Sequence, residues 1–78
     1  MKYLIVEDFS GQAVPFIFPR RVDHFDMREQ LRYGRIISGG FVELGPHGFV
    51  CTGENMELGI AARPDEDARI LAEALRRR

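Results

Sequence analysis

The fold is decided by the segment GRIISGGFVELGPHGFVCTGENMELGIAA, which spans residues 34–62. Apolar residues alternate with other residues in three runs, and glycine-containing turn sequences at 45–48 and 53–55 separate these runs. Period-two alternation is typical of strands, and turn residues between such runs are typical of tight reversals. The segment therefore predicts three successive strands. We expect them over 35–44, 49–52 and 56–60.

Two features inside these strands carry further information. Gly39 and Gly40 stand in the middle of the first strand, and paired glycines there indicate a β-bulge or a close approach by another backbone. Both interpretations stay open at this point. In the third strand, the alternation places Met56, Leu58 and Ile60 on one inward row.

The residues before the segment predict two more strands. Residues 2–7 are apolar on both sides of the alternation, so this strand is expected to be partly covered on both faces. Residues 13–18 are also extended, but Pro15 removes one backbone donor from the ladder. This second strand is therefore expected either to be irregular or to lie at an edge of the sheet, where it can recruit a partner strand or be defended against one.

A short helix is predicted between the second and third strands. Asp23 is suited to cap its start, and the helix is expected to end near residues 33–34. Met27 and Leu31 lie four residues apart and form its inward face, with polar residues between them.

The last element is the clearest helix in the chain. It begins at Pro64, carries acidic residues at 65–67 and ends in the arginines 76–78, as the helix dipole favours. Its broad apolar stripe is expected to pack on the sheet. The fold class is therefore α+β, a single domain over residues 1–78 with the element order β-β-α-β-β-β-α. The simplest packing places both helices on one face of a mainly antiparallel sheet.

Composition excludes several classes of protein. Lys plus Arg number 11 and Asp plus Glu number 12, so the net charge of −1 supplies no general attraction for nucleic acid. A single cysteine, Cys51, cannot form an internal disulfide, which fits a reducing compartment. No run of about 18 apolar residues is present, and the first residues lack the features of a signal peptide. A cytoplasmic location without membrane contact is the expectation.

Two residue clusters combine groups that could carry chemistry. His24 with Asp23 and Asp26 could share a divalent cation, but both carboxylates are explained by the helix start, and a lone first-turn histidine is usually solvated. Cys51 and His47 could form a thiolate and its base, but a cysteine inside a strand is more often a small buried hydrophobe. We therefore predict no catalytic residue, no metal site and no cofactor.

Contacts with other molecules are the remaining source of function. The segment around Phe16, Phe18, Arg20 and Arg21 combines an expected strand edge with a basic loop, and it is the predicted interaction site. The alternative is a nucleic-acid-binding or regulatory protein that uses Arg20–Arg21 and Arg76–Arg78. The α-β-β-β-α order from Asp23 onward matches that of a double-stranded-RNA-binding domain, but the acidic start of the last helix would repel phosphates, which disfavours nucleic acid.

Four stretches carry a resemblance to a known group of proteins. They are IFP at residues 17–19, DHFDM at 23–27, ISGGFVEL at 37–44 and ELGIAARPDEDARILAEAL at 57–75. Together they resemble small proteins encoded by bacteriophages and prophages, to which no known activity is attached. The resemblance implies a bacterial cytoplasm as the location and a host or phage protein as the partner. We expect a non-enzymatic accessory protein that acts by protein–protein interaction, with a homodimer as a further form.

Overall fold

A computed structural model describes residues 1–31 and 34–76 of the chain. The order of strands and helices follows the prediction, with a short pair of strands near residue 57 in place of one longer strand. The elements are β1 (Lys2–Glu7), β2 (Ala13–Phe18), α1 (His24–Gln30), β3 (Arg35–Gly45), β4 (Gly48–Thr52), β5 (Glu54–Asn55), β6 (Ile60–Ala61) and α2 (Pro64–Arg76).

The main sheet has four antiparallel strands in the order β2-β1-β3-β4. The α+β class is therefore confirmed, and β2 is an edge strand as Pro15 predicts. β1 lies inside the sheet between β2 and β3, and its residues Tyr3 to Val6 are at most 1% exposed. Such burial on both faces matches the continuous apolar run in this part of the sequence.

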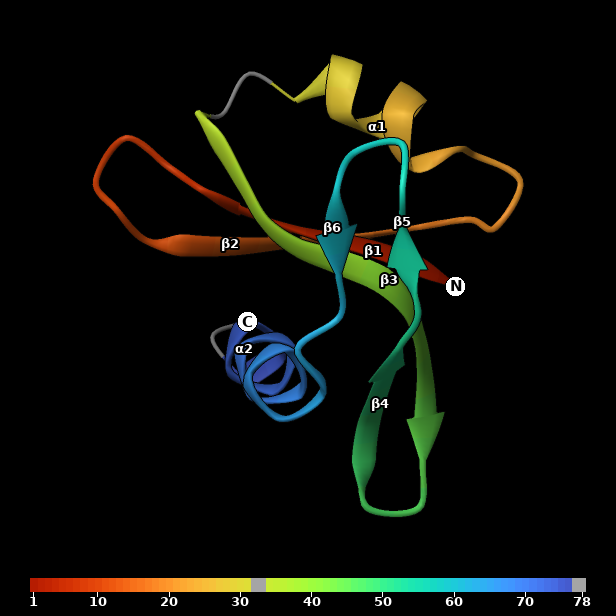
Figure 1. Ribbon diagram of the computed structural model, residues 1–78. Helices are drawn as coiled ribbons and strands as arrows, with labels where there is room; N and C mark the ends of the chain where they lie inside the picture. The colour runs from red at the N-terminus through yellow and green to blue at the C-terminus, as the bar shows by residue number, and fades with distance from the viewer. Residues whose placement is uncertain (32–33, 77–78) are drawn as a thin grey trace.

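The two helices lie on opposite faces of the sheet, with α1 above and α2 below in Figure 1. The expected packing of both helices on one face is therefore wrong. The alternation along β1 explains why: the Lys2 Nζ donates to the Val22 carbonyl oxygen beside α1 at 2.9 Å, while the neighbouring Tyr3 hydroxyl reaches Asp67 of α2. Because β1 is apolar on both sides, each face needs its own cover.

The glycine pair of β3 marks close approaches rather than a bulge. A Cβ at Gly39 would lie 2.7 Å from the Ile60 side chain, and a Cβ at Gly40 would collide with the Thr52 carbonyl oxygen. The irregularity in the β1–β3 pairing lies elsewhere, between Ile5 and Val6. Gly39 and Gly40 thus let other segments cross tightly over β3.

The segment 54–61 departs from the prediction of one strand. Its ends pair as β5 and β6, with Glu54 opposite Ala61 and Asn55 opposite Ile60, and a turn joins them. Met56 is 86% exposed in that turn, so its expected inward position is wrong. The Asn55 side chain accepts a hydrogen bond from the Leu58 backbone at 2.9 Å, and this local bond favours the turn.

The start of α1 also differs from expectation. Asp23 occupies the N-cap position but makes no side-chain capping bond, and its carboxylate instead lies 3.8 Å from the Lys2 ammonium. The helix ends at Gln30, and residue 33, where the end was expected, lies outside the described residues. Within the described part of the chain, no helix is long and apolar enough to cross a membrane.

Candidate interaction surfaces

A buried carboxylate is the feature most suggestive of chemistry. Asp67 of α2 is 0% exposed and accepts hydrogen bonds from the Tyr3 hydroxyl at 2.5 Å and the Ser38 hydroxyl at 2.8 Å. The backbone N–H of Arg63 adds a third bond at 2.8 Å, and the Arg63 guanidinium adds two more at 3.0 and 3.1 Å. These groups join α2 to both central strands of the sheet.

The donors around Asp67 leave no position for a substrate. A carboxylate offers about four lone-pair sites, and five donors from this chain already converge on the two oxygens of Asp67. Burial and the bond to Asp67 raise the pKa of the Tyr3 phenol well above its usual range, so the phenol stays a neutral donor. The cluster is therefore an internal anchor of α2.

The Cys51–His47 pair and the cluster around His24 have environments that differ from those of reactive groups. Cys51 is buried and burial raises the pKa of its thiol, whereas His47 is exposed in the β3–β4 turn. His24 is not solvated as expected but 2% exposed, and its Nε2–H donates to the Gly40 carbonyl oxygen at 2.9 Å. Across residues 1–31 and 34–76, no group of three or more His, Cys, Asp or Glu residues is placed to hold a metal ion.

His24 instead packs α1 onto the sheet. Its ring stands edge-on to Phe18 at 5.3 Å and to Phe41 at 5.9 Å. In this position the ring satisfies one N–H while burying its apolar edges. The role could not be predicted from the sequence because two partners of His24, Gly40 and Phe41, lie on β3 on the other side of α1 in the chain.

The four predicted interaction residues have different environments. Phe18 is 3% exposed and belongs to the core beside His24, so it cannot contact a partner. Phe16 is half-buried on β2. Arg20 and Arg21 are exposed, and the Arg20 guanidinium lies over the Phe41 ring at 5.4 Å. In the second basic cluster, Arg76 is exposed, and residues 77 and 78 lie outside the described part of the chain.

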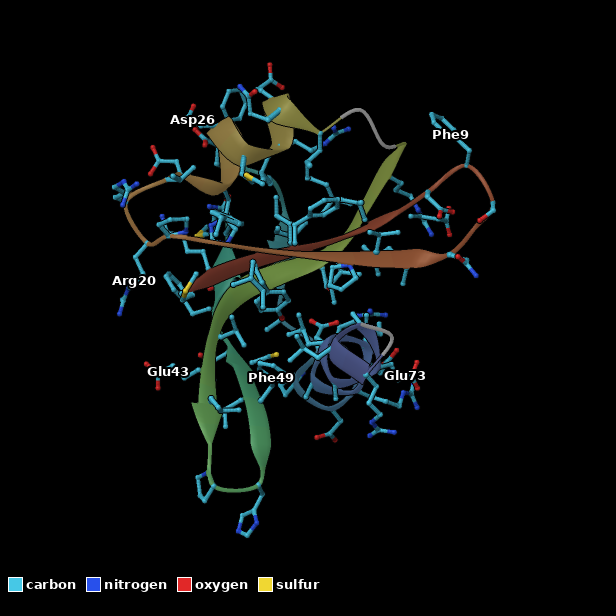
Figure 2. All side chains as sticks on the ribbon, turned by 180° about the vertical axis from the view of Figure 1, so that it is seen from behind. Phe9, Arg20, Asp26, Glu43, Phe49 and Glu73 are labelled. Carbon is cyan, nitrogen blue, oxygen red and sulfur yellow. The ribbon has the colours of Figure 1, made fainter. Side chains whose placement is uncertain are left out.

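An exposed apolar surface lies beside the β3–β4 hairpin, which projects past α2 in Figure 1. We call it the hairpin surface. It encloses a hollow of about 350 Å³ lined by Met1, Ile17, Val42, Glu43, Leu44 and Phe49. Leu44 is 77% exposed and Met1 is 49% exposed, whereas Val42 forms the buried floor. Figure 2 shows Phe49 between β4 and α2, at the inner side of this surface.

The signal for the hairpin surface is present in the sequence. Leu44 and Phe49 flank the turn Gly45 to Gly48, at the end of a hairpin where polar residues would be the norm. The alternation alone places Leu44 on an inward row with Val42. The pattern does not show that the hairpin tip projects past α2 in the fold, which leaves Leu44 77% exposed.

A second surface is the free edge of β2. Met1 and Val42 exchange backbone hydrogen bonds of 3.1 and 2.8 Å, so the polar groups of Met1 point toward β3. In an antiparallel ladder, the backbone N–H and C=O groups of successive residues point to alternate sides. The backbone groups of Lys2, Leu4 and Val6 therefore point toward β2. On β2, the backbone groups of Phe18, Phe16 and Val14, which pair with these residues, point toward β1. The backbone groups of the other β2 residues point away from the sheet. The outward residues are Ala13, Pro15 and Ile17.

Comparison of the chain with protein-family models, with curated proteins and with solved structures finds no match.

Proposed function

We propose that this protein acts by binding another protein through the hairpin surface and carries out no reaction of its own. The observation that carries the proposal is the exposed apolar hollow at one end of the sheet, rimmed by Leu44 and Met1. Exposed apolar surface that forms a contiguous concave patch marks interaction sites more often than scattered single residues do.

The interior of the molecule supports the same proposal. Among the described residues, every buried side-chain nitrogen or oxygen atom has a hydrogen-bond partner within the chain. A catalytic group would need an open hydrogen-bonding position facing a cavity. The hydrogen-bonding positions of the buried Asp67 carboxylate are occupied by the hydroxyls of Tyr3 and Ser38 and by the backbone N–H of Arg63.

The context of the proposal follows from the resemblance to small phage and prophage proteins. A bacterial cytoplasm would be the site of action, and a host or phage protein would be the partner. A compact protein of this kind acts by occupying a surface of its target. The hairpin surface supplies an apolar centre, with Glu43 as a polar member of its rim.

The test is a capture experiment with the tagged protein in bacterial lysate, run with and without nuclease and read by mass spectrometry. The proposal predicts a stoichiometric protein partner that Leu44→Asp removes, because a charge at this position opposes desolvation of the hollow. Leu44 is 77% exposed, so this variant keeps the fold, as circular dichroism checks.

The matched control is Phe9→Asp. Phe9 is 91% exposed in the β1–β2 loop, which Figure 2 shows far from the hairpin. The Phe9→Asp substitution removes a comparable apolar side chain from a different part of the surface. Equal capture by wild type and Leu44→Asp would reject the hairpin surface, and a catch that nuclease abolishes would favour nucleic-acid binding through the arginines instead.

A further inference from the structure

The free edge of β2 lies beside a groove that the hairpin surface does not include. Gln12, Ala13, Val14 and Pro15 form one wall, and Ile70, Glu73 and Ala74 of α2 form the other, around a volume of about 370 Å³. Figure 2 shows Glu73 on the side of α2 that faces the same end of the molecule as the Phe9 loop. An edge strand beside a helix is one geometry in which proteins accept an added strand.

The hydrogen-bonding groups of this edge are unevenly distributed. The outward carbonyl groups of Ala13, Pro15 and Ile17 are three acceptors, while only Ala13 and Ile17 offer an N–H. Among residues 1–31 and 34–76, none of these outward groups has a backbone partner. An added strand therefore makes five of the six bonds that three such positions allow in an uninterrupted ladder.

Pro15 also decides against a second copy of this chain as the added strand. Two β2 edges paired around a twofold axis would each lack the Pro15 donor, so the pair would lose two bonds where a foreign strand loses one. A foreign strand with an N–H opposite the Pro15 carbonyl is the better fit. The added strand is therefore expected to come from a different protein.

The side chains around the groove define the chemistry of the added strand. Ala13, Pro15 and Ile17 share the face of β2 that carries α2, because their partners in the register include Tyr3 and Ile5 of the α2-side core. Ile17, which lines the neighbouring hollow of the hairpin surface, is 41% exposed and apolar. Glu73 is the one charged residue of the groove lining described. An antiparallel strand places an apolar side chain opposite Ile17 and, four residues later, a side chain opposite Ala13 beside Glu73.

We propose that the β2 edge and the α2 groove bind an extended segment of the partner protein, in which an apolar residue is followed four positions later by a lysine or arginine. This inference rests on the proposed protein-binding function and deepens it. The backbone bonds hold the segment, and the pairing of its basic residue with Glu73 sets its register.

The test uses the heptapeptide Thr-Leu-Thr-Val-Thr-Lys-Thr with both ends blocked. Added to the full chain labelled with ¹⁵N, it is expected to shift the amide signals of Ala13 and Ile17 with a Kd below about 1 mM. Before addition, these two amides exchange with solvent faster than those of Val14, Phe16 and Phe18, which bond to β1. Binding slows the exchange of the two outward amides.

Two variants and a second peptide make the test specific. Pro15→Ala adds the missing donor and is expected to tighten binding about fivefold. Glu73→Lys, on an exposed position, is expected to weaken binding about threefold, and a peptide with glutamate in place of lysine restores it. The inference would be overturned if neither peptide shifted the amide signals of Ala13 and Ile17. It would also be overturned if both variants bound the peptides with the affinity of the wild type.

The outcome separates this inference from the proposed function. If the peptides fail while Leu44→Asp still removes a captured partner, the β2 edge is not the segment-binding site and the protein-binding function stands. If the peptides bind as expected while no variant alters capture, the edge is confirmed and the hairpin surface is rejected. If the chain formed concentration-dependent dimers in which the amides of Ala13 and Ile17 were protected from exchange, the added strand would be a second copy of this chain and not a foreign segment.

Discussion

Asp67 joins α2 to the sheet through donors from three separate segments. Its carboxylate receives the hydroxyls of Tyr3 and Ser38 and both the backbone and side chain of Arg63. A buried carboxylate is stable only when such donors replace the lost water. In a chain of 78 residues, whose core is small, this single residue is expected to contribute a large share of the total stability.

Asp67→Asn tests this contribution. An amide in place of the carboxylate turns one acceptor into a donor that faces other donors, so we expect the free energy of unfolding to fall by about 2–4 kcal/mol. Urea denaturation followed by circular dichroism measures the change. The control Glu66→Gln removes an exposed ion pair with Arg63 and is expected to change stability by less than about 1 kcal/mol. Similar losses in both variants would contradict the anchor role.

Tyr3 links stability to alkaline pH. Its folded-state pKa is raised above the ordinary value of 10.0, so the unfolded chain ionises the phenol while the folded chain keeps it neutral. The contribution of Tyr3 is therefore complete below about pH 10 and is lost as the pH rises further. We expect the free energy of unfolding to be lower at about pH 11 than at about pH 8.

Tyr3→Phe isolates this effect. Phenylalanine does not ionise, so the drop between the two pH values should be smaller in the variant, although the variant is less stable at both. The comparison is made in a Cys51→Ala background, because burial also raises the pKa of that thiol. An equal alkaline drop with and without the Tyr3 hydroxyl would show that the linkage lies in other groups.

The crossing over β3 depends on its two glycines. Segments before and after the β5–β6 pair pass so close to this strand that a Cβ at Gly40 would meet the Thr52 carbonyl oxygen and the Ala62 side chain. Backbone cannot yield as a flexible side chain can. This contact, and not a bulge, explains the paired glycines in the sequence.

Gly40→Ala is expected to destabilise the protein by about 2 kcal/mol or more, because the added methyl group forces the Thr52 backbone aside. Gly34→Ala is the matched control, since a Cβ there meets no atom within 4 Å and its φ is not in the left-handed region. Thermal unfolding of both variants measures the difference. Equal melting temperatures would show that β3 has room at Gly40.

Elements governed by neighbours in sequence could be predicted, and those governed by distant partners could not. β1 and β2 have the expected bounds, and α2 begins at the expected Pro64, because alternation, proline and helix-start residues act locally. The burial of His24, the donors around Asp67 and the exposure of Leu44 depend on which segments meet in space. The sequence contains these residues but not their pairing.

The molecule as a whole is a four-stranded sheet covered by one helix on each face, with a hairpin extending beyond the cover (Figure 1). Its buried polar groups are satisfied internally among the described residues, and its exposed apolar side chains include Leu44 and Met1 of the hairpin surface. This division between a closed interior and an open apolar end is the physical basis of the proposed binding function.

The most direct test of that function is the nuclease-treated capture with wild type, Leu44→Asp and Phe9→Asp in parallel. We predict one stoichiometric protein partner that is retained by wild type and by Phe9→Asp and lost with Leu44→Asp. A partner that binds all three proteins equally, or one that is lost only with Phe9→Asp, would contradict the assignment of the hairpin surface.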